Sequence, residues 1–337
     1  MLHIGLFDSQ IIAQNLINGA DSFPLLAVPF FMLAGEIMNS GGLARRIVTV
    51  AMTLVGHVRG GLGYVAILAA CILSSLSGSA LADAAALAAL LVPMMVRAGH
   101  SRPHSAGLIA SCGVIGPIIP PSIGFVIFGV TGGVSISKLF LAGIFPGILL
   151  GLGLAVAWWW VTRNDPPSSQ ARAPLSEVLK ALVDGFWALM LPVIIIVGLR
   201  FGIFTPTEAA VVVAVYALVV ATCIYRELKL SDLPKLFISA AQTTAIVMFL
   251  VAAALVGSWL ITVAEITHEI VAMVEPLIEH KTLLLLAIMA IVVIVGTALD
   301  MTPTILILTP VLMPIVKAAG IDPSISACCS SSIIPSA

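Results

Sequence analysis

Most of this chain is apolar, so its few clusters of hydroxyl, carboxyl and glycine residues show where chemistry could take place. Two clusters interrupt stretches that otherwise resemble membrane helices, one at residues 74–83 (SSLSGSALAD) and one at residues 296–303 (GTALDMTP). Both supply hydroxyls, backbone carbonyls and one acid, and oxygen ligands of this kind suit a hard cation. The sequence therefore predicts a paired Na+ site formed by Ser77, Gly78, Ser79, Gly296, Thr297 and Asp300.

A third interruption, residues 116–124 (GPIIPPSIG), contains adjacent prolines that forbid a continuous helix. Such sequence is tolerated at membrane depth only where protein or a polar cavity covers it, so each interruption indicates a site. The helices that begin after these breaks direct their positive ends at anionic substrates. We expect an organic acid to bind at Ser79, Asp83, Pro120, Pro121, Ser122, Thr302, Pro303 and Thr304.

Purely structural roles are the alternative for these residues. Small side chains let helices pack closely, and this is the role expected for Gly147, Gly151 and Gly153. Asp83 and Asp300 are intramembrane acids, which are costly to bury and therefore functional by default. Each could equally cap the helix that follows it.

The composition predicts an integral membrane protein. Of 337 residues 60% are hydrophobic and 9% are charged, and the mean hydropathy is +1.18. These values are typical of membrane helices. A net charge of −1 excludes nucleic acid as a partner, because phosphate binding needs a dense Lys and Arg surface.

The order of apolar segments predicts an all-α fold built from two inverted repeats, each with a re-entrant hairpin and a broken helix. The expected parts are a surface segment (1–22), a first repeat (23–161, with hairpin 61–96 and broken helix 106–130), a cytoplasmic linker (162–185), an incomplete second repeat (186–323, with hairpin 282–316) and an aberrant tail (324–337). The hairpin legs are expected at 62–73, 84–96, 283–295 and 304–316, each shorter than the roughly 20 residues that cross a bilayer.

Charge and internal similarity support this organisation. Of the 15 Lys and Arg residues, all but Lys138, Arg200, Lys281 and Lys317 fall on the side of Arg45, which the positive-inside rule makes cytoplasmic. The two hairpins then open to opposite sides. A shift of 217 residues places Asp83 on Asp300 and Pro93 on Pro310, as in the inverted repeats of secondary transporters.

Catalytic motifs are missing from the sequence. It shows neither a Ser, His and Asp arrangement for hydrolysis nor a phosphate-binding loop for ATP, so an enzyme is not expected. Positions at the membrane interface are expected for Glu36, His57, His100 and His104. An aromatic belt is expected at Trp158, Trp159 and Trp160.

Five segments together resemble the large membrane subunit of TRAP transporters, the tripartite ATP-independent periplasmic uptake systems. They are residues 29–36 (PFFMLAGE), 77–83, 116–122, 202–209 (GIFTPTEA) and 300–314. The resemblance implies an elevator mechanism in the bacterial inner membrane, with uptake driven by Na+ and no other cofactor. It also implies a periplasmic solute-binding protein that delivers an organic acid, and a small four-helix membrane subunit. Residues 18–23 and the three tryptophans are similar to the sugar-acid branch, which takes up diketogulonate.

The chain departs from this family at both ends. Family members begin with a further hydrophobic helix and continue past residue 323 through a second broken helix. Residues 324–337 do not resemble a membrane helix, and suitable codons for 325–337, entered two nucleotides later, encode the apolar segment FGVLFIINYSVG. We therefore expect a frameshifted tail and a fragment impaired in folding and transport.

Other functional classes remain open at this stage. A single-component Na+-coupled carboxylate symporter or an antiporter would share inverted hairpins and elevator motion. An accessory membrane role would suit a fragment. An intramembrane protease would need paired acids facing one another, and the sequence supplies Asp83 and Asp300 on different hairpins.

Overall fold

The computed structural model describes residues 9–77, 80–164, 172–264, 281–299 and 301–322, with side chains for all of these except 9, 74–77 and 80–83. All regular secondary structure in its described part is helical. The elements are α1 (Ser9–Ala20), η2 (Phe23–Leu26), α2 (Ala27–Ser40), α3 (Leu43–Val55), α4 (Gly61–Ser77), α5 (Ala80–Arg97), α6 (Arg102–Gly113), α7 (Ile123–Gly132), α8 (Ile136–Thr162), α9 (Leu175–Arg200), α10 (Pro206–Val219), η3 (Val220–Ile224), η4 (Leu230–Asp232), α11 (Leu233–Val263), α13 (Lys281–Gly296) and α14 (Met301–Ala318).

Six helical segments in the described part are long and apolar enough to cross a membrane. They are Phe23–Ser40, Ile136–Thr162, Leu175–Arg200, Pro206–Ile224, Leu230–Val263 and Met301–Ala318. The prediction of an all-α multi-pass membrane protein agrees with them. The last segment is α14, for which a shorter leg was expected; its helix begins at Met301 and so includes Thr302 and Thr304.

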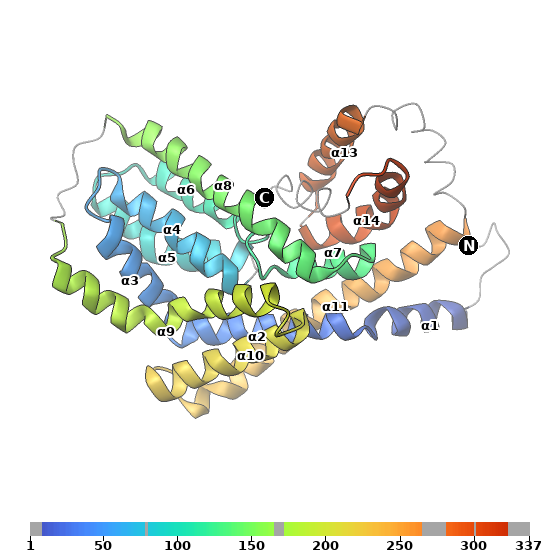
Figure 1. Cartoon of the computed structure of the whole chain (residues 1–337), viewed down its shortest axis with the longest axis horizontal. Coiled ribbons are helices and arrows are strands. Elements are labelled where there is room, and N and C mark those ends of the chain that lie inside the picture. The colour runs from blue at the N-terminus through green and yellow to red at the C-terminus, as the bar shows by residue number, and fades with distance from the viewer. Residues whose placement is uncertain (1–8, 78–79, 165–171, 265–280, 300, 323–337) are drawn as a thin grey trace.

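The helices lie in two groups (Figure 1). A long row contains α9, α2, α10, α11 and α1, in which α2 packs against α10 and α11. On one side of this row stand α4, α5 and α6, crossed by α8, and farther along stand α7, α13 and α14. Helix α3 joins the row to the first hairpin through its contacts with α9 and α4.

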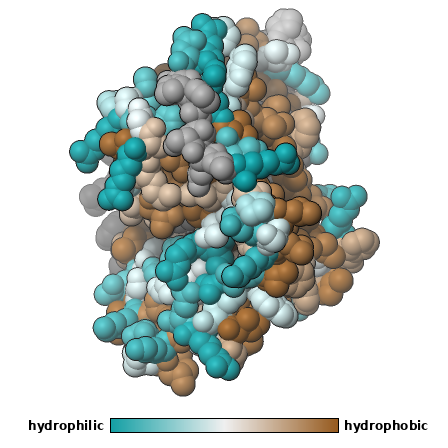
Figure 2. All heavy atoms as spheres, turned by 90° about the vertical axis from the view of Figure 1, so that its left-hand side faces the viewer, coloured by the Kyte–Doolittle hydropathy of each residue, from teal (hydrophilic) through white to brown (hydrophobic). Residues whose placement is uncertain are grey.

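The predicted cytoplasmic side corresponds to one end of the molecule. The end of α8, at the upper left of Figure 1, and the beginning of α9, at the lower left, lie on the same side of the molecule. Figure 2 faces that end and shows hydrophilic side chains over much of it. This distribution agrees with the concentration of basic residues in the loops there.

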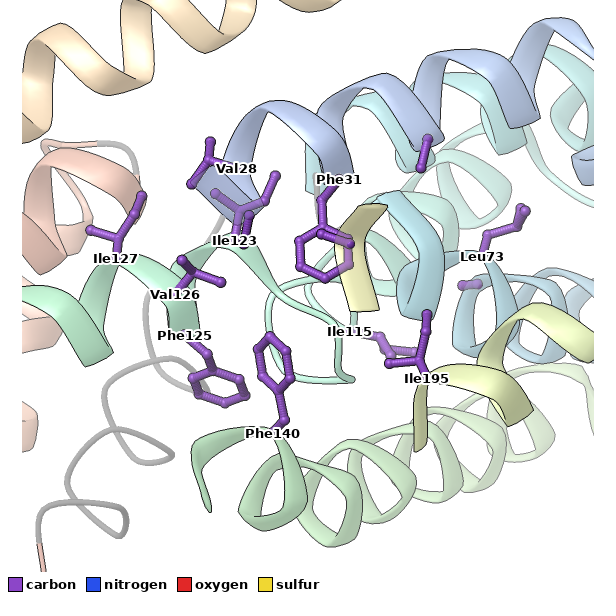
Figure 3. Packing of buried hydrophobic residues seen from close by; sticks show 14 of the residues in the cluster. Val28, Phe31, Leu73, Ile115, Ile123, Phe125, Val126, Ile127, Phe140 and Ile195 are labelled. Carbon is purple, nitrogen blue, oxygen red and sulfur yellow. The ribbon is translucent and has the colours of Figure 1, made fainter. Parts of the chain in front are cut away.

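Aromatic side chains connect the row to the broken helix. Phe31 of α2 and Phe125 of α7 each lie 6.4 Å, between ring centroids, from Phe140 of α8. All three are essentially inaccessible, and Figure 3 shows the rings meeting between the three helices. Burial of such large side chains contributes strongly to packing, so this cluster holds α7 and α8 against α2.

Several predicted boundaries need correction. The first hairpin was expected to be non-helical over 74–83, but α4 continues to Ser77 and α5 begins at Ala80. Serine and alanine are compatible with helical backbone when tertiary packing supports it. Likewise α9 begins at Leu175, so the helix includes residues 175–185 of the predicted linker. The predicted tail, 324–337, lies outside the described residues.

Candidate functional site

The predicted helix break is present between α6 and α7. Helix α6 ends at Gly113, turns occupy 114–121, and α7 begins at Ile123 after Ser122 in extended conformation. Pro120 and Pro121 supply no amide donors, which prevents a continuous hydrogen-bond ladder. Nearly all residues of the break are buried. Protein therefore covers the irregular backbone, as a bilayer requires.

Glycines of α8 cover one side of the break. A methyl group on Gly143 would overlap the carbonyl oxygen of Ile118 and lie 2.5 Å from Phe125 Cε2. One turn later, a methyl group on Gly147 would lie 2.5 Å from Ile119 Cγ1. The backbone of α8 therefore approaches the break closely only because these positions lack side chains.

The same face of α8 also packs against α4 of the first hairpin. A methyl group on Gly151 would lie 2.9 Å from the Cys71 Sγ atom of α4, whereas one on Gly153 would meet nothing within 4 Å. The expected packing role is thus confirmed for Gly147 and Gly151 and is wrong for Gly153, which faces away. Because Gly147 and Gly151 are one turn apart, α8 holds the second half of α4 beside the break.

Helix α14 of the second hairpin covers another side. A methyl group on Gly124 would overlap Met301 Cε, and one on Gly132 would lie 3.3 Å from Thr309 Cγ2. The beginnings of α7 and α14 are therefore adjacent, and the two helices run in the same direction. This arrangement places Met301, the residue before Thr302, against Gly124, two residues after Ser122.

Ser122 has an unusual environment at this junction. The residue is fully buried, yet its Oγ atom has no hydrogen-bond partner among the described residues, and it does not cap α7. A buried hydroxyl without a partner costs free energy. On the neighbouring helix, Thr304 is 1% exposed and its hydroxyl donates to the Leu299 carbonyl at 3.5 Å. The hydrogen-bonding capacity of the Ser122 hydroxyl is therefore not used by the described residues.

The junction is also electrostatically favourable to anions. Each helix N-terminus carries a partial positive charge from its unpaired amides, and two such ends lie side by side here. Arg and Lys side chains are not among the buried residues of the described part. An anion would therefore be attracted mainly by backbone dipoles and hydroxyl groups.

Each hairpin tip lies between the C-terminus of one helix and the N-terminus of the next, α4 and α5 in the first hairpin and α13 and α14 in the second. Ser77 is the last residue of α4 and Gly296 the last of α13, so carbonyls point from these ends. Thr297 follows, exposed, with its hydroxyl donating to the Ile294 carbonyl at 2.7 Å. Helix C-termini of this kind attract cations. The other predicted Na+ ligands, Gly78, Ser79 and Asp300, lie outside the described residues. In the described part no cluster of His, Cys, Asp and Glu could hold a metal ion.

For Asp83 the structure describes the position of the backbone and not that of the side chain. It is the fourth residue of α5, which begins at Ala80. The alternative that Asp83 serves as N-cap is therefore wrong, because an N-cap residue precedes the helix. Its position near the helix start still suits a carboxylate.

Comparison with known proteins decides the family. The model of the tripartite ATP-independent periplasmic transporter, DctM component, matches residues 2–329. The chain belongs to this family.

Three relatives show how far this similarity extends. The chain is 58% identical to the 2,3-diketo-L-gulonate TRAP transporter large permease protein YiaN of Escherichia coli K12, over 96% of the chain and 76% of the relative. It is 39% identical to the sialic acid TRAP transporter large permease protein SiaM of Vibrio cholerae, over 92% and 73%. It is 38% identical to the C4-dicarboxylate TRAP transporter large permease protein DctM of Pseudomonas aeruginosa, over 93% and 73%.

Membership settles several predictions. The chain is a multi-pass bacterial membrane permease of the DctM family and not an enzyme. A tripartite transporter also implies two further components. The match to residue 329 includes the first residues of the predicted tail.

Two contacts of this DctM-family permease escaped the sequence analysis. Trp158, predicted in the aromatic belt, is only 3% exposed and donates from Nε1 to the Gly60 carbonyl at 2.8 Å, whereas Trp159 and Trp160 are exposed. The belt prediction is therefore wrong for Trp158. The missing side chain at Gly63, against which the indole packs, was the available signal.

Glu36 takes part in a contact between helices. Its carboxylate accepts a hydrogen bond from Ser239 Oγ at 2.9 Å, which joins α2 to α11. The two residues are 203 positions apart, so no local pattern could have paired them.

Proposed function

We propose that this chain is the substrate-translocating permease of a Na+-coupled uptake system for organic acids. The observation that carries the proposal is the Ser122 hydroxyl, which is buried where α7 and α14 begin and has no hydrogen-bond partner among the described residues. A carboxylate bound there would accept a hydrogen bond from Ser122 and face two positive helix ends. The remaining substrate contacts would come from Ser79, Asp83, Pro120, Pro121, Thr302, Pro303 and Thr304.

The substrate class follows from this chemistry and from the relatives. The three relatives above carry the names of 2,3-diketo-L-gulonate, sialic acid and C4-dicarboxylate transporters, and all three names denote organic acids. A carboxylate is their common feature and is what paired helix N-termini bind. A sugar acid is the proposed substrate because identity is greatest, among these three, to the diketogulonate permease.

Na+ would bind at the opposite helix ends. The last turns of α4 and α13 leave carbonyls without helical partners, which attract a cation. The proposed ligands are Ser77, Gly78, Ser79, Gly296, Thr297 and Asp300. Bound Na+ would then lie near the substrate carboxylate, and their attraction would couple the two binding events.

Transport would occur by an elevator movement of an inverted-repeat fold. The close glycine contacts would keep α4, α8 and the break together as one body. The row of α2, α10 and α11 would form the scaffold. A periplasmic solute-binding protein would deliver the substrate, and a small membrane subunit would support the scaffold.

Uptake of labelled organic acids tests the proposal. Cells co-express this chain with its binding protein and small subunit, and uptake of 2,3-diketo-L-gulonate is measured with and without Na+. We expect uptake that requires both Na+ and the binding protein. Uptake that persists without the binding protein would instead indicate a single-component carrier.

Ser122→Ala tests the site itself. Losing one charge-assisted hydrogen bond should raise the KM about tenfold or more. Ser111→Ala is the matched control, because the Ser111 hydroxyl only donates to the Gly107 carbonyl within α6. Equal KM values for the two variants, at equal membrane abundance, would remove Ser122 from the site.

A further inference from the structure

A pocket of mixed charge lies between α3 and α9, away from the candidate transport site. Its cavity volume is about 590 Å³. One wall is a face of α3, and the other is a face of α9 and the end of η3. The lining residues used below are Arg46, Thr49, Glu177, Lys180, Asp184 and Trp187.

The Arg46 side of the pocket is rigid. Arg46 donates to Glu227 at 2.6 Å, and its guanidinium stacks over Tyr225 at 3.7 Å from the ring centroid. Tyr225 in turn donates to the Asp184 carbonyl at 2.8 Å. Burial raises the pKa of Tyr225, so its phenol remains a donor at neutral pH. These contacts tie α3, α9 and the segment after α10 together.

The α9 side of the pocket carries charged side chains that are weakly paired or lack an ionic partner within the described part of the chain. Arg46 Nε lies 3.5 Å from Asp184 Oδ2 and, among the described residues, makes no hydrogen bond. The side chains of Glu177 and Lys180 form no ion pair or hydrogen bond with any residue that the structure describes. The pocket therefore presents the Lys180 ammonium and, within one turn of it on α9, the Glu177 carboxylate and the Asp184 carboxylate, of which Asp184 also faces Arg46.

Charge balance indicates the kind of ligand. Glu227 is already paired with both Arg45 and Arg46 at 2.6 Å. Of the other lining groups, Lys180 is basic and Glu177 is acidic, and neither has an ionic partner among the described residues, whereas the carboxylate of Asp184 has a 3.5 Å ion pair with Arg46 Nε. A purely anionic ligand would meet two carboxylates, and a purely cationic one would meet Lys180. A zwitterion satisfies both signs.

The surroundings indicate a lipid. The pocket lies on the side predicted to be cytoplasmic, where α9 begins (Figure 1). Val183 lines the pocket and is 67% exposed, and exposed apolar side chains continue along α9 at Phe186 and Val193. Trp187, also in the lining, suits the boundary between headgroups and acyl chains.

We propose that this pocket binds the headgroup of phosphatidylethanolamine from the cytoplasmic leaflet. The phosphate would contact Lys180, and the primary ammonium would donate hydrogen bonds to Asp184 and Glu177. The acyl chains would extend along the exposed apolar face of α9. This site is separate from the transport site, because its lining residues come from α3, α9 and the end of η3 and include none of the residues proposed to bind substrate or Na+.

Native mass spectrometry of the full chain with added lipids tests the proposal. The probes are phosphatidylethanolamine, phosphatidylcholine and phosphatidylglycerol with identical acyl chains. We expect phosphatidylethanolamine to bind about tenfold more tightly than the other two, because a trimethylammonium cannot donate hydrogen bonds and a glycerol headgroup has no cation. Equal binding of the three lipids would overturn the proposal.

Two variants separate the headgroup contacts. Lys180→Gln changes an exposed residue that has no ion pair among the described residues, and it should weaken binding of phosphatidylethanolamine and phosphatidylcholine alike, because both contain the phosphate. Asp184→Asn should abolish the preference for phosphatidylethanolamine over phosphatidylcholine. Arg200→Gln, at the other end of α9, is the control. If Lys180→Gln binds lipid as Arg200→Gln does, or if the small subunit displaces the lipid, the pocket is not a lipid site.

Discussion

Gly143→Ala tests whether α8 positions the broken helix. Gly143 lies where α8 crosses the break, and a methyl group there would overlap the Ile118 carbonyl oxygen and lie 2.5 Å from Phe125 Cε2. Neither neighbour can yield easily, because one is backbone and Phe125 is fully buried. An ordinary contact of 3.4 Å requires a movement of about 1 Å, which the substitution must force on the break.

The expected effect has two parts. Alanine improves helix propensity by about 0.5–1 kcal/mol, whereas overpacking a filled core costs about 1–3 kcal/mol. The net loss of stability should therefore lie between about 0 and 2.5 kcal/mol. A displacement of about 1 Å at a binding site can reduce function about 100-fold. Transport should consequently fall more than stability does.

Gly153→Ala is the matched control on the same helix. It gains the same propensity, and its methyl group would meet nothing within 4 Å. Uptake of labelled organic acid and the thermal midpoint of the detergent-solubilised protein are measured for both variants. Should Gly143→Ala match Gly153→Ala in both measurements, the idea that α8 positions the break is wrong.

Two further predictions concern stability. Trp158→Phe removes the hydrogen bond to Gly60 and leaves a buried carbonyl unpaired, so unfolding should become easier by about 1–3 kcal/mol, whereas the same change at the exposed Trp159 should have little effect on the thermal midpoint. Glu227→Gln removes the partner of two arginines of α3 and should lower the midpoint by an amount that shrinks as salt is added; Asp232→Asn, outside this network, should not show that salt dependence.

The local features of the fold could be predicted from the sequence because each depends on residues that are close together in the chain. The break at Pro120 and Pro121 follows from missing donors, and the long apolar helices follow from composition. The tip of the first hairpin was predicted too long, because packing keeps Ser77 and Ala80 helical where local composition suggested a loop. The capping role considered as an alternative for Asp83 is consequently excluded by the start of α5 at Ala80.

The tertiary structure determines which residues are buried, which are in contact and which face outward. The sequence by itself determined an all-helical membrane permease with breaks at residues 116–124, because the cost of unpaired backbone in lipid leaves few alternatives. Only the packing of α7 on α14 shows that Ser122 is buried beside a second helix N-terminus, with no hydrogen-bond partner in the part of the chain that the structure describes. The burial of Trp158 and the outward position of Gly153 also depend on which way a helix is rotated. That rotation is set by contacts between residues distant in the chain, which no local pattern contains.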